Sequence, residues 1–404
     1  MHGNYINRDI SERLISYLTY FPCVALLGPR QSGKSTLAKK VLKNWESSVL
    51  LDLELPSDLQ KLNEPELFFR SHENHLVCLD EIQRKPEIFS ILRSVIDSRD
   101  RNSQFLILGS ASRDLIRQSS ESLAGRIVYL ELTPFLASEV AGEDTWDDEV
   151  IRRIWFRGGF PRSYLADSDE LSKVWRDNFI RTFLERDIPQ LGFNIPADSL
   201  YRLWQMCAHS HGQLLNQTVL GQSLGLSHVT IRSYLEILAQ TYTLRLLRPF
   251  QKNIKKRLVK TPKLFLRDSG LLHALLNIPS FTELMGHPVY GASWEGMAIE
   301  NIIAWHEGCE FYFYRTSSGA ELDLLLVKGN KKIGFEFKAS MAPTLQRGFW
   351  NSLEDLEPDM TFIIAPVKES YPVKQHVVTT NLKTYFNRHR MDAVSYTHLT
   401  LPTN

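Results

Sequence analysis

The stretch CVALLGPRQSGKSTLAKKVL, residues 23–42, decides the fold of the N-terminal third of the chain. Its first five residues form a short apolar run that predicts a buried strand, and the apolar positions after Ser35 recur at helical spacing. Between them GPRQSGKS, residues 28–35, matches the phosphate-loop pattern GxxxxGK[ST] in the strand-to-helix context that the motif requires. The stretch therefore predicts a nucleotide-binding loop within an α/β domain.

Each part of this loop has an expected task in binding ATP and Mg²⁺. Glycines let the backbone turn tightly, so that its N–H groups point at the β-phosphate, and the following helix adds a partial positive charge. We expect Lys34 to bridge the β- and γ-phosphates and Ser35 to ligate Mg²⁺. The predicted nucleotide-binding residues are Gly28, Pro29, Arg30, Gln31, Ser32, Gly33, Lys34, Ser35 and Thr36.

Four further apolar runs follow within the first 135 residues, and polar stretches of helical spacing separate them. The runs are residues 48–53, 75–80, 104–109 and 126–132. Near-continuous apolar strands that alternate with helices are typical of a parallel sheet covered on both faces. We therefore expect an α/β fold built on a P-loop NTPase parallel sheet.

Polar residues follow these strands where a ligand would bind. HLVCLDE ends in Asp80 and Glu81, and ligands of open α/β sheets bind at the carboxyl ends of the strands. Asp80 is expected to hold the Mg²⁺ water shell and Glu81 to polarise the attacking water, although adjacent carboxylates can also start a helix. Ser110 is a candidate contact to the γ-phosphate or a helix cap. Arg126 is a candidate γ-phosphate contact in this or a neighbouring subunit, or a surface charge.

The composition is that of an ordinary globular protein. Charged residues make up 23% and hydrophobic residues 43% of the 404 residues, which favours a chain that buries sizeable cores. The net charge of +1 leaves any nucleic-acid contact to a local patch. No CxxC pair and no run of 18 apolar residues occur, which favours buried thiols in a cytoplasmic protein without a membrane segment.

Several motifs together resemble a large prokaryotic family of AAA-type ATPases with a C-terminal domain of unknown function. These motifs are GPRQSGKST, LDEIQRKP, LGSASRDL, SLAGR, GGFPRSYL, RTFLERDI and PKLFLRDSGLL. The resemblance spans about residues 5–385. It implies a P-loop ATPase of the type with an additional strand in the sheet and a catalytic glutamate, which would be Glu81.

The middle of the chain, residues 216–250, resembles a winged helix-turn-helix. Ser227 is expected to cap a helix whose core face holds Val229, Ile231, Tyr234, Leu235 and Leu238. The opposite face would offer His228, Thr230, Arg232 and Ser233 to a major groove. A basic segment without acidic residues follows, and a wing-like hairpin there would contact phosphates. Its charges are Arg245, Arg248, Lys252, Lys255, Lys256, Arg257, Lys260 and Lys263. Winged helices also serve as protein-binding modules, and a run of charges is often a solvated face.

A late hairpin, Gly319–Ser340, holds four charges inside two apolar runs. With Gly329-Asn330 as a two-residue turn, or with a longer loop of the same register, Asp323 faces Glu336 and Glu321 faces Lys338. Strict alternation places these four side chains on one face of the hairpin. The opposite face would hold Leu322, Leu324, Phe335 and Phe337.

Because facing like charges destabilise a sheet, the pair of carboxylates predicts a divalent cation between them. The pattern is similar to that of PD-(D/E)XK nucleases, in which a helix adds a further acid, here Glu295 or Glu300. In that hypothesis Glu295, Asp323 and Glu336 hold Mg²⁺ while Lys338 stabilises charge on phosphorus. The alternative is a retained fold without catalysis, with Glu321 and Lys338 as a surface ion pair.

The predicted organisation follows from these patterns. It consists of a P-loop AAA-type ATPase core (1–135), a helical lid (136–199), a winged-helix-like domain (200–268), a nuclease-like domain (285–390) and a non-native tail (392–404), which resembles a translated sequencing adapter.

The sequence thus predicts an Mg²⁺-dependent ATPase associated with nucleic acid as a switch or motor. DNA, a second copy of the chain or another protein are the expected partners. The alternative is a nucleotide-gated protein-interaction scaffold with little turnover and an inactive nuclease fold.

Overall fold

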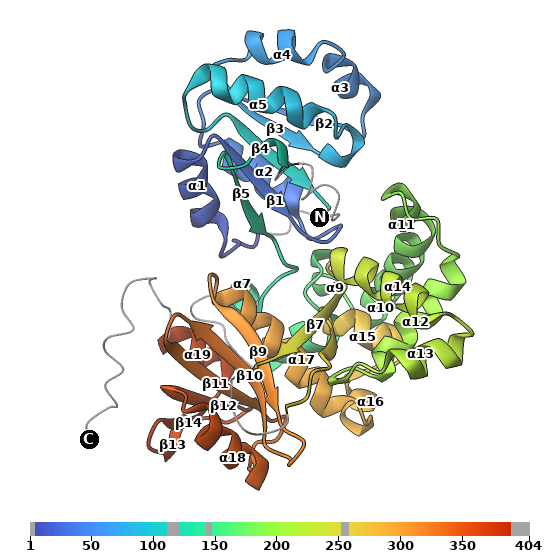
Figure 1. Cartoon of the computed structure of the whole chain (residues 1–404), viewed down its shortest axis with the longest axis vertical. Coiled ribbons are helices and arrows are strands. Elements are labelled where there is room, and N and C mark those ends of the chain that lie inside the picture. The colour runs from blue at the N-terminus through green and yellow to red at the C-terminus, as the bar shows by residue number, and fades with distance from the viewer. Residues whose placement is uncertain (1–4, 111–118, 120, 142–147, 252–257, 389–404) are drawn as a thin grey trace. The chain divides into compact units, whose positions relative to one another are not determined.

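The structure is a computed structural model, and it describes residues 5–110, 119, 121–141, 148–251 and 258–388 (Figure 1). Contacts within the chain divide it into two units. The first unit comprises Met1–Leu246 and Leu264–His287, and the second comprises Leu247–Lys263 and Pro288–Asn404. The chain therefore leaves the first unit at Leu247, returns to it at Leu264 and leaves it again at Pro288. The predicted middle domain, residues 200–268, contributes to both units.

A five-stranded parallel sheet forms the centre of the N-terminal part of the first unit. Its strands are β1 (Cys23–Leu27), β2 (Ser48–Asp52), β3 (Leu76–Asp80), β4 (Phe105–Gly109) and β5 (Ile127–Glu131). They lie in the order β2-β3-β4-β1-β5, with every described pairing parallel. All five predicted runs form strands. Strand β4 lies between β1 and β3, as the additional strand of the resembled family requires.

Helices cover both faces of this sheet, because alternate strand residues point to opposite sides. The helices are α1 (Ser11–Tyr20), α2 (Lys34–Leu42), α3 (Pro56–Lys61), α4 (Pro65–Ser71), the 3₁₀ turn η1 (Ile82–Arg84) and α5 (Ile88–Arg99). Helices α1 and α2 bury Leu14 and Leu37 against one face. Helices α4 and α5 bury Phe69 and Leu92 against the other. The predicted α/β fold is confirmed.

A helical region completes the first unit. Its elements are α7 (Ala137–Ala141), α8 (Asp148–Arg157), α9 (Pro161–Tyr164), α10 (Asp169–Thr182), the π-helical turn η2 (Phe183–Asp187), α11 (Ile188–Gln190), α12 (Ala197–His209), β6 (Gln213–Leu214), α13 (Gln217–Leu224), α14 (His228–Gln240), α15 (Ser269–Leu275) and α16 (Phe281–Gly286). Strands β7 (Leu244–Pro249) and β8 (Lys263–Leu266) contain the points at which the chain passes between the units.

Two of the recognised motifs, GGFPRSYL and PKLFLRDSGLL, meet in a buried junction of this helical region. Asp268 accepts the N–H of Gly159 at 2.8 Å and caps α15. A Cβ added to Gly270 would lie 2.1 Å from the carbonyl oxygen of Arg157, so only glycine allows the backbones this approach. The fully buried Arg176 donates to the Gly270 carbonyl at 2.9 Å. The motif residues here therefore hold the fold.

Helices α13 and α14 form the predicted helix-turn-helix. Ser227 Oγ accepts the N–H of Thr230 at 3.1 Å, which confirms the cap. Ile231 and Leu235 are buried as expected, but the assignment of Val229 to the core face was wrong, since it is 77% exposed. It precedes Ile231 by two residues, which is about 200° around a helix. The tip of the predicted wing lies outside the described residues, and the winged-helix assignment stays a prediction.

The second unit is a mixed sheet with helices on both sides. Its elements are α17 (Tyr290–Trp305), β9 (Glu310–Arg315), β10 (Glu321–Lys328), β11 (Lys331–Phe337), α18 (Arg347–Leu356), β12 (Met360–Ile364), β13 (Tyr371–Lys374), β14 (Val377–Thr380) and α19 (Leu382–Arg388). The strand order is β13-β14-β12-β11-β10-β9, and the end of β7 pairs in parallel with β9. Helix α18 packs on one face through Phe349, and α19 packs on the other through Tyr385.

The β10–β11 hairpin has the predicted register, with Leu324 opposite Phe335 and Lys328 opposite Lys331 across the Gly329-Asn330 turn. The pairing of β10 with β9 shifts between Leu322 and Leu325. Because of this shift, Leu322 shares a core cluster with Leu325 rather than a face with Leu324. Strict alternation was therefore the wrong assumption around Asp323.

Candidate functional site

The phosphate loop turns in the way that its glycines allow. Gly28 has a φ of 157°, and an added Cβ would lie 2.2 Å from the carbonyl oxygen of Leu132. Gly33 has a φ of 99°, in the left-handed region that favours glycine, and it precedes the first residue of α2. The loop thus joins the carboxyl end of β1 to a helix N-terminus, where an anion is stabilised.

Lys34 is buried in this loop and is held by neutral acceptors. Its Nζ donates to the carbonyls of Gly28 at 3.0 Å and Pro29 at 2.8 Å. Burial lowers the pKa of Lys34 to about 8, although the carboxylates of Glu81 and Asp80 oppose this shift. A phosphate oxygen would be a stronger acceptor than a carbonyl for this ammonium.

Two further polar groups complete the predicted phosphate and Mg²⁺ site. The hydroxyl of Ser32 is buried, and no hydrogen-bond partner for it occurs within the described residues. The Ser35 side chain hydrogen-bonds Asp80 at the end of β3, and burial raises the pKa of that carboxyl. A hydroxyl beside a carboxylate at a phosphate loop fits the oxygen donors that Mg²⁺ prefers. The residues present therefore fit a nucleotide with Mg²⁺.

Glu81 follows β3 in a strained backbone conformation with a φ of 56°. Such outliers persist where surrounding contacts hold them and often occur at functional sites. The Gln83 side-chain amide donates to Glu81 Oε2 and lies 3.2 Å from the hydroxyl of Ser110, which follows β4. Burial raises the pKa of Glu81, while the cations of Arg30 and Lys34 act against it. Asp80, Glu81 and Ser110 thus share one edge of the sheet, as predicted.

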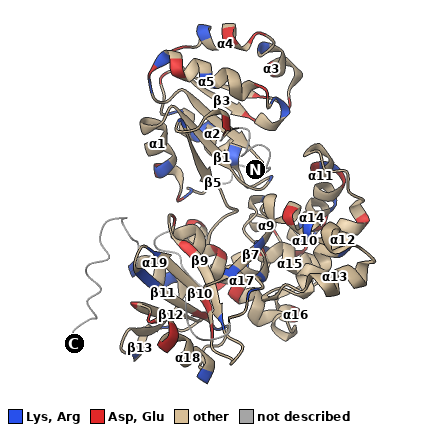
Figure 2. Ribbon diagram, in the orientation of Figure 1, with Lys and Arg blue, Asp and Glu red and all other residues tan. Residues whose placement is uncertain are grey.

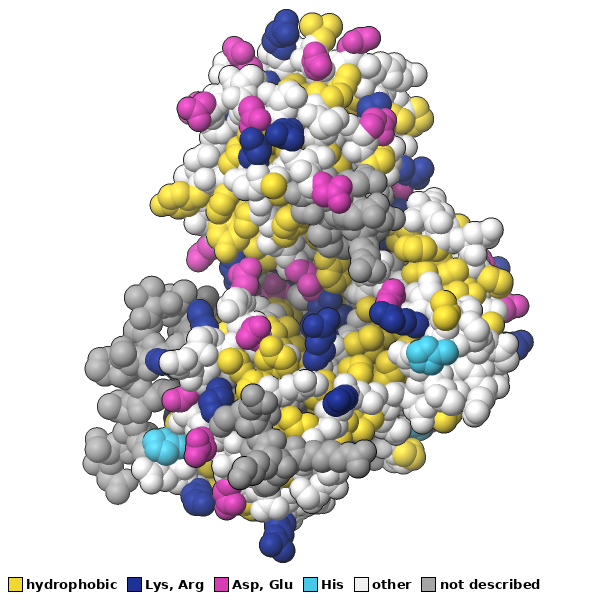
Figure 3. Space-filling view, in the orientation of Figure 1, with side chains coloured by type: hydrophobic (Ala, Val, Ile, Leu, Met, Phe, Trp, Pro, Cys, Tyr) yellow, Lys and Arg dark blue, Asp and Glu magenta, His cyan; other side chains and the backbone are white. Residues whose placement is uncertain are grey.

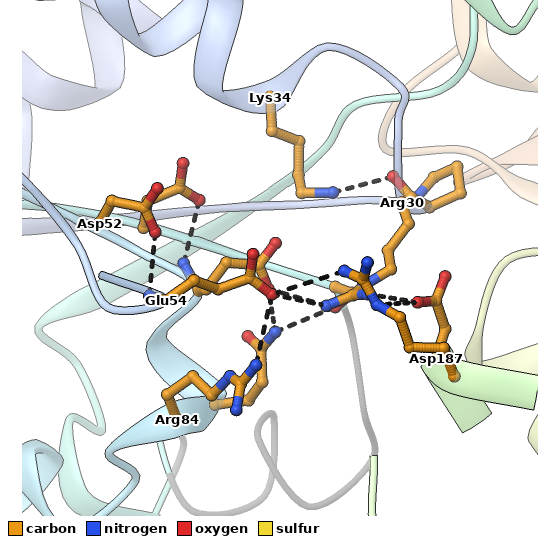
Figure 4. A network of polar contacts seen from close by, with 12 residues as sticks. Arg30, Lys34, Asp52, Glu54, Arg84 and Asp187 are labelled. Atoms are coloured by element: carbon orange, nitrogen blue, oxygen red, sulfur yellow. Dashed lines mark hydrogen bonds and ion pairs between the residues drawn. The ribbon is translucent and has the colours of Figure 1, made fainter. Parts of the chain in front are cut away.

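Arg30 connects this edge to the helical region of the first unit. Its guanidinium donates to Asp187 of η2 and lies 3.3 Å from Glu54 and 3.8 Å from Glu81, as part of the network in Figure 4. Burial alone would lower the pKa of Arg30, but Asp187 and Glu81 outweigh it and raise it. Sequence reasoning placed Arg30 in the loop but missed its contacts and Gln83. Glu81 and Gln83 belong to the motif LDEIQRKP and Asp187 to RTFLERDI, whereas Glu54 lies outside both.

Arg126 lies at the opposite edge of the sheet from the phosphate loop. It precedes β5, whose first residue Ile127 pairs with Cys23 at the start of β1. Four residues of strand, about 13 Å, separate that edge from the loop. Its guanidinium forms an ion pair with Asp97 at 2.5 Å. Arg126 therefore does not contribute to the site of its own chain, and a contact to a neighbouring subunit stays a prediction.

The predicted acids of the second unit also come together, but around a lysine. Figure 2 shows acidic positions on α17 and β10. Lys263 Nζ lies 3.0 Å from Glu321, 3.4 Å from Glu295 and 3.5 Å from Asp323, and its side chain is 4% exposed. Burial alone would lower the pKa of Lys263, but the three carboxylates outweigh it and raise it. Glu295, rather than Glu300, is the helix acid of this cluster.

Glu336 and Lys338 form a pair beside this cluster. Lys338 Nζ donates to Glu336 Oε1 at 2.6 Å, while Glu336 Oε2 is buried, with no partner among the described residues. Burial and the neighbouring Asp323 raise the pKa of Glu336. The expected pairing of Glu321 with Lys338 was wrong, since Glu321 pairs with Lys263 and, at 3.6 Å, with Arg315. The shift in the β9–β10 pairing gives β10 a different path from the one that alternation assumed.

Three domain models and one relative match most of the chain. An AAA domain model matches residues 20–141, a domain of unknown function (DUF8612) matches 148–282, and another (DUF4143) matches 290–385. The uncharacterized protein Rv2008c of Mycobacterium tuberculosis is 41% identical over 371 residues, which cover 92% of this chain and 82% of that protein. The chain belongs to this family of AAA-domain proteins. No helix within the described ranges is long and apolar enough to cross a membrane.

The solved structures that resemble this chain are less similar to it in sequence than Rv2008c is. The Walker-type ATPase PABY2304 of Pyrococcus abyssi is 15% identical with a TM-score of 0.48, and the match covers 68% of this chain and 96% of that one. A RuvB variant of Thermotoga maritima is 20% identical with a TM-score of 0.33, and the match covers 60% and 90% of the two chains. The assignment of an AAA-type fold to this chain rests on the order of its strands and on the match to the AAA domain model.

The Mg²⁺ expected in the DUF4143 region does not fit the residues found there. Within the described part of the chain, no group of three or more acidic, histidine or cysteine side chains could hold a metal ion. Lys263 lies among the oxygens that such an ion would need. The expectation that Glu295, Asp323 and Glu336 form a metal site is therefore not met in this structure.

The structure describes some of the residues predicted to contact nucleic acid, and others lie outside the described ranges. Arg232 is exposed on α14 and pairs with Glu236 at 3.1 Å. Lys252, Lys255, Lys256 and Arg257 lie outside the described residues. Counting Lys263 with them as a phosphate contact was wrong, because it is buried among carboxylates. On the face in Figure 3, described Lys and Arg side chains are scattered among acidic and hydrophobic ones.

Proposed function

We propose that the first unit binds ATP with Mg²⁺ and hydrolyses it. The observation that supports this most is the convergence of Lys34, Ser35, Asp80 and Glu81 at one edge of a parallel sheet. The arrangement supplies backbone N–H groups and a lysine for the phosphates, an oxygen pair for a cation, and a carboxylate for water. Mg²⁺ at Ser35 and Asp80 would neutralise charge on the phosphate oxygens.

The catalytic roles in this proposal follow from the contacts. Glu81 accepts a proton from the attacking water, and its raised pKa makes it a better base than an ordinary carboxylate. Gln83 orients Glu81 and links it to Ser110, which would contact the γ-phosphate or the water. Lys34 exchanges its carbonyl partners for phosphate oxygens. Arg30, which contacts Glu81 and Asp187, is a positioning residue that relates the loop to the helical region.

Substitution of Glu81 by glutamine tests this proposal. The amide keeps the shape of the side chain but cannot accept the proton, so phosphate release should fall at least about 100-fold while ATP still binds. Glu87→Gln is the matched control, because that side chain is 66% exposed and not part of the site. Equal phosphate release by wild type and Glu81→Gln would refute hydrolysis at this site.

A second candidate function is a nucleotide-gated scaffold with little turnover. It is favoured by the ion pair and hydrogen bond that occupy Glu81 in this structure. Under this proposal wild type binds ATP as the hydrolase would, yet releases phosphate as slowly as Glu81→Gln does. The two proposals therefore differ in the ratio of phosphate release by wild type to phosphate release by Glu81→Gln. This ratio is large for a hydrolase and close to one for a scaffold.

We further propose that the ATPase acts with nucleic acid as a switch or motor, through the helix-turn-helix and the basic segment after it. The exposed Arg232 and the local excess of positive charge support this. ATP hydrolysis should rise when duplex DNA is added, and the rise should decrease with added salt. Hydrolysis unchanged by DNA at low salt would favour a protein partner instead.

A further inference from the structure

The acidic cluster of the second unit brings together residues from several elements of the fold. Glu295 comes from α17, Glu321 and Asp323 from β10, and Glu336 from β11. Lys263 is the first residue of β8 and enters the cluster from a segment remote in sequence. All five residues belong to the second unit. Their arrangement is therefore a property of that unit alone.

We propose that the ammonium group of Lys263 is the resident cation of this cluster and occupies the position in which a nuclease-like site would hold a divalent ion. Its three carboxylate contacts, at 3.0 to 3.5 Å, lie within the distance of ion pairs. A divalent ion needs carboxylate oxygens at about 2.0–2.6 Å. It cannot share these oxygens at that distance with an ammonium already between them.

The oxygens of Asp323 and Glu336 are largely engaged by other partners. Asp323 uses Oδ1 for Lys263 and Oδ2 to accept the N–H of Phe337 at 3.0 Å. Glu336 uses Oε1 for Lys338. Its other oxygen is the buried carboxylate oxygen of the cluster without a partner within the described residues. A divalent ion at this oxygen would share its carboxylate with the ammonium of Lys338, which lies 2.6 Å from Oε1.

The cation is therefore part of the chain, and the cluster is held together without metal. Burying several carboxylates near one another is costly unless a cation compensates them. Lys263 supplies that compensation from a position 4% exposed, where ions from solvent cannot readily exchange with it. The second unit thus has a nuclease-like set of residues that is closed to the ion a nuclease needs.

The test compares the binding of Mn²⁺ to the full chain, without nucleotide, in wild type and in Lys263→Met. Methionine keeps most of the volume of the stem and removes the charge. We expect wild type to show no bound Mn²⁺ that depends on Asp323, by electron paramagnetic resonance. Lys263→Met should gain one such ion, lost again in Lys263→Met/Asp323→Asn. Lys260→Met, three residues away and exposed, should behave as wild type.

Thermal unfolding supplies an independent measurement. At a Mn²⁺ concentration about 100-fold above its dissociation constant, the melting temperature of Lys263→Met should rise by roughly 3 °C while that of wild type stays constant. If Lys263→Met does not fold, wild type and Lys263→Arg still decide the question, because both should remain without Mn²⁺ in the cluster. An Asp323-dependent Mn²⁺ ion in wild type would overturn the proposal. None of these measurements involves ATP, so their failure is distinct from failure of the proposed ATPase.

Discussion

Replacing Arg30 by methionine tests whether the charge of its guanidinium stabilises the contact between the phosphate loop and the helical region of the first unit. Arg30 contacts Asp187, Glu54 and Glu81, so one cation serves three carboxylates. The side chain of Arg30 is 13% exposed and that of Asp187 is 7% exposed, and both have therefore lost most of their water. Methionine retains the apolar stem and removes the guanidinium. The three carboxylates then lose their common partner.

The contacts of Arg30 and Asp187 limit the free energy of unfolding that Arg30→Met should lose. Removing one member of a fully buried pair costs about 3–5 kcal/mol, because it leaves the other charge uncompensated. Here Asp187 keeps a contact to Arg186 at 3.7 Å, so we expect about 2–3 kcal/mol for Arg30→Met. Asp187→Asn should cost roughly half as much, since Arg30 then keeps Glu54 and Glu81. The double variant should show a coupling of about 1–2 kcal/mol.

Urea unfolding of the nucleotide-free protein, followed by circular dichroism and tryptophan fluorescence, measures these free energies. Arg93→Met is the control, because Arg93 is exposed on α5 and its loss should stay within about 0.5 kcal/mol. Losses of Arg30→Met and Asp187→Asn that simply add would refute the coupling. So would an Arg30→Met protein as stable as Arg93→Met.

Three further predictions concern the first unit. The affinity for ATP should stay level below the Lys34 pKa of about 8 and fall by up to about tenfold per pH unit above it, because binding then requires proton uptake. A nucleotide titration in which the affinity does not change with pH would contradict this. Gly270→Ala should cost about 3 kcal/mol in thermal unfolding because its Cβ meets a backbone oxygen at 2.1 Å, whereas Gly291→Ala, with open space around it, should cost nothing. Arg126→Ala should leave the ATP dissociation constant of the dilute protein unchanged; weaker binding there would show that Arg126 acts in its own chain.

Local patterns were enough to predict the parts of the chain in which neighbours in sequence determine the structure. The five apolar runs became the five strands because apolar runs of this short length, separated by helical stretches, are typical of a sheet covered on both faces. The edge that holds Asp80, Glu81 and Ser110 followed from the parallel direction of those strands. The Gly329-Asn330 turn set the register of its hairpin, because a two-residue turn fixes which residues of the two strands face each other.

Contacts between remote segments could not be predicted in this way. Asp187 lies 157 residues after Arg30, and no periodicity relates the two. Lys263 stands in a run of positive charges that is typical of a solvated face. Only the folded sheet brings it to the acids of α17 and β10. The shift at Asp323 was equally hidden, because a bulge changes the alternation on which facial assignment rests.

The two buried lysines, Lys34 and Lys263, show why burial alone does not mark a ligand site. Lys34 is held by the neutral carbonyls of Gly28 and Pro29, and burial lowers its pKa to about 8. Its charge is under-compensated, so an arriving phosphate gains a strong partner at little cost. Lys263 has three carboxylates, which raise its pKa against the effect of burial. A phosphate there would meet their repulsion, and a metal ion would have to displace the ammonium. The acceptors around each ammonium therefore leave the first site open to an anion and the second closed to both kinds of ion.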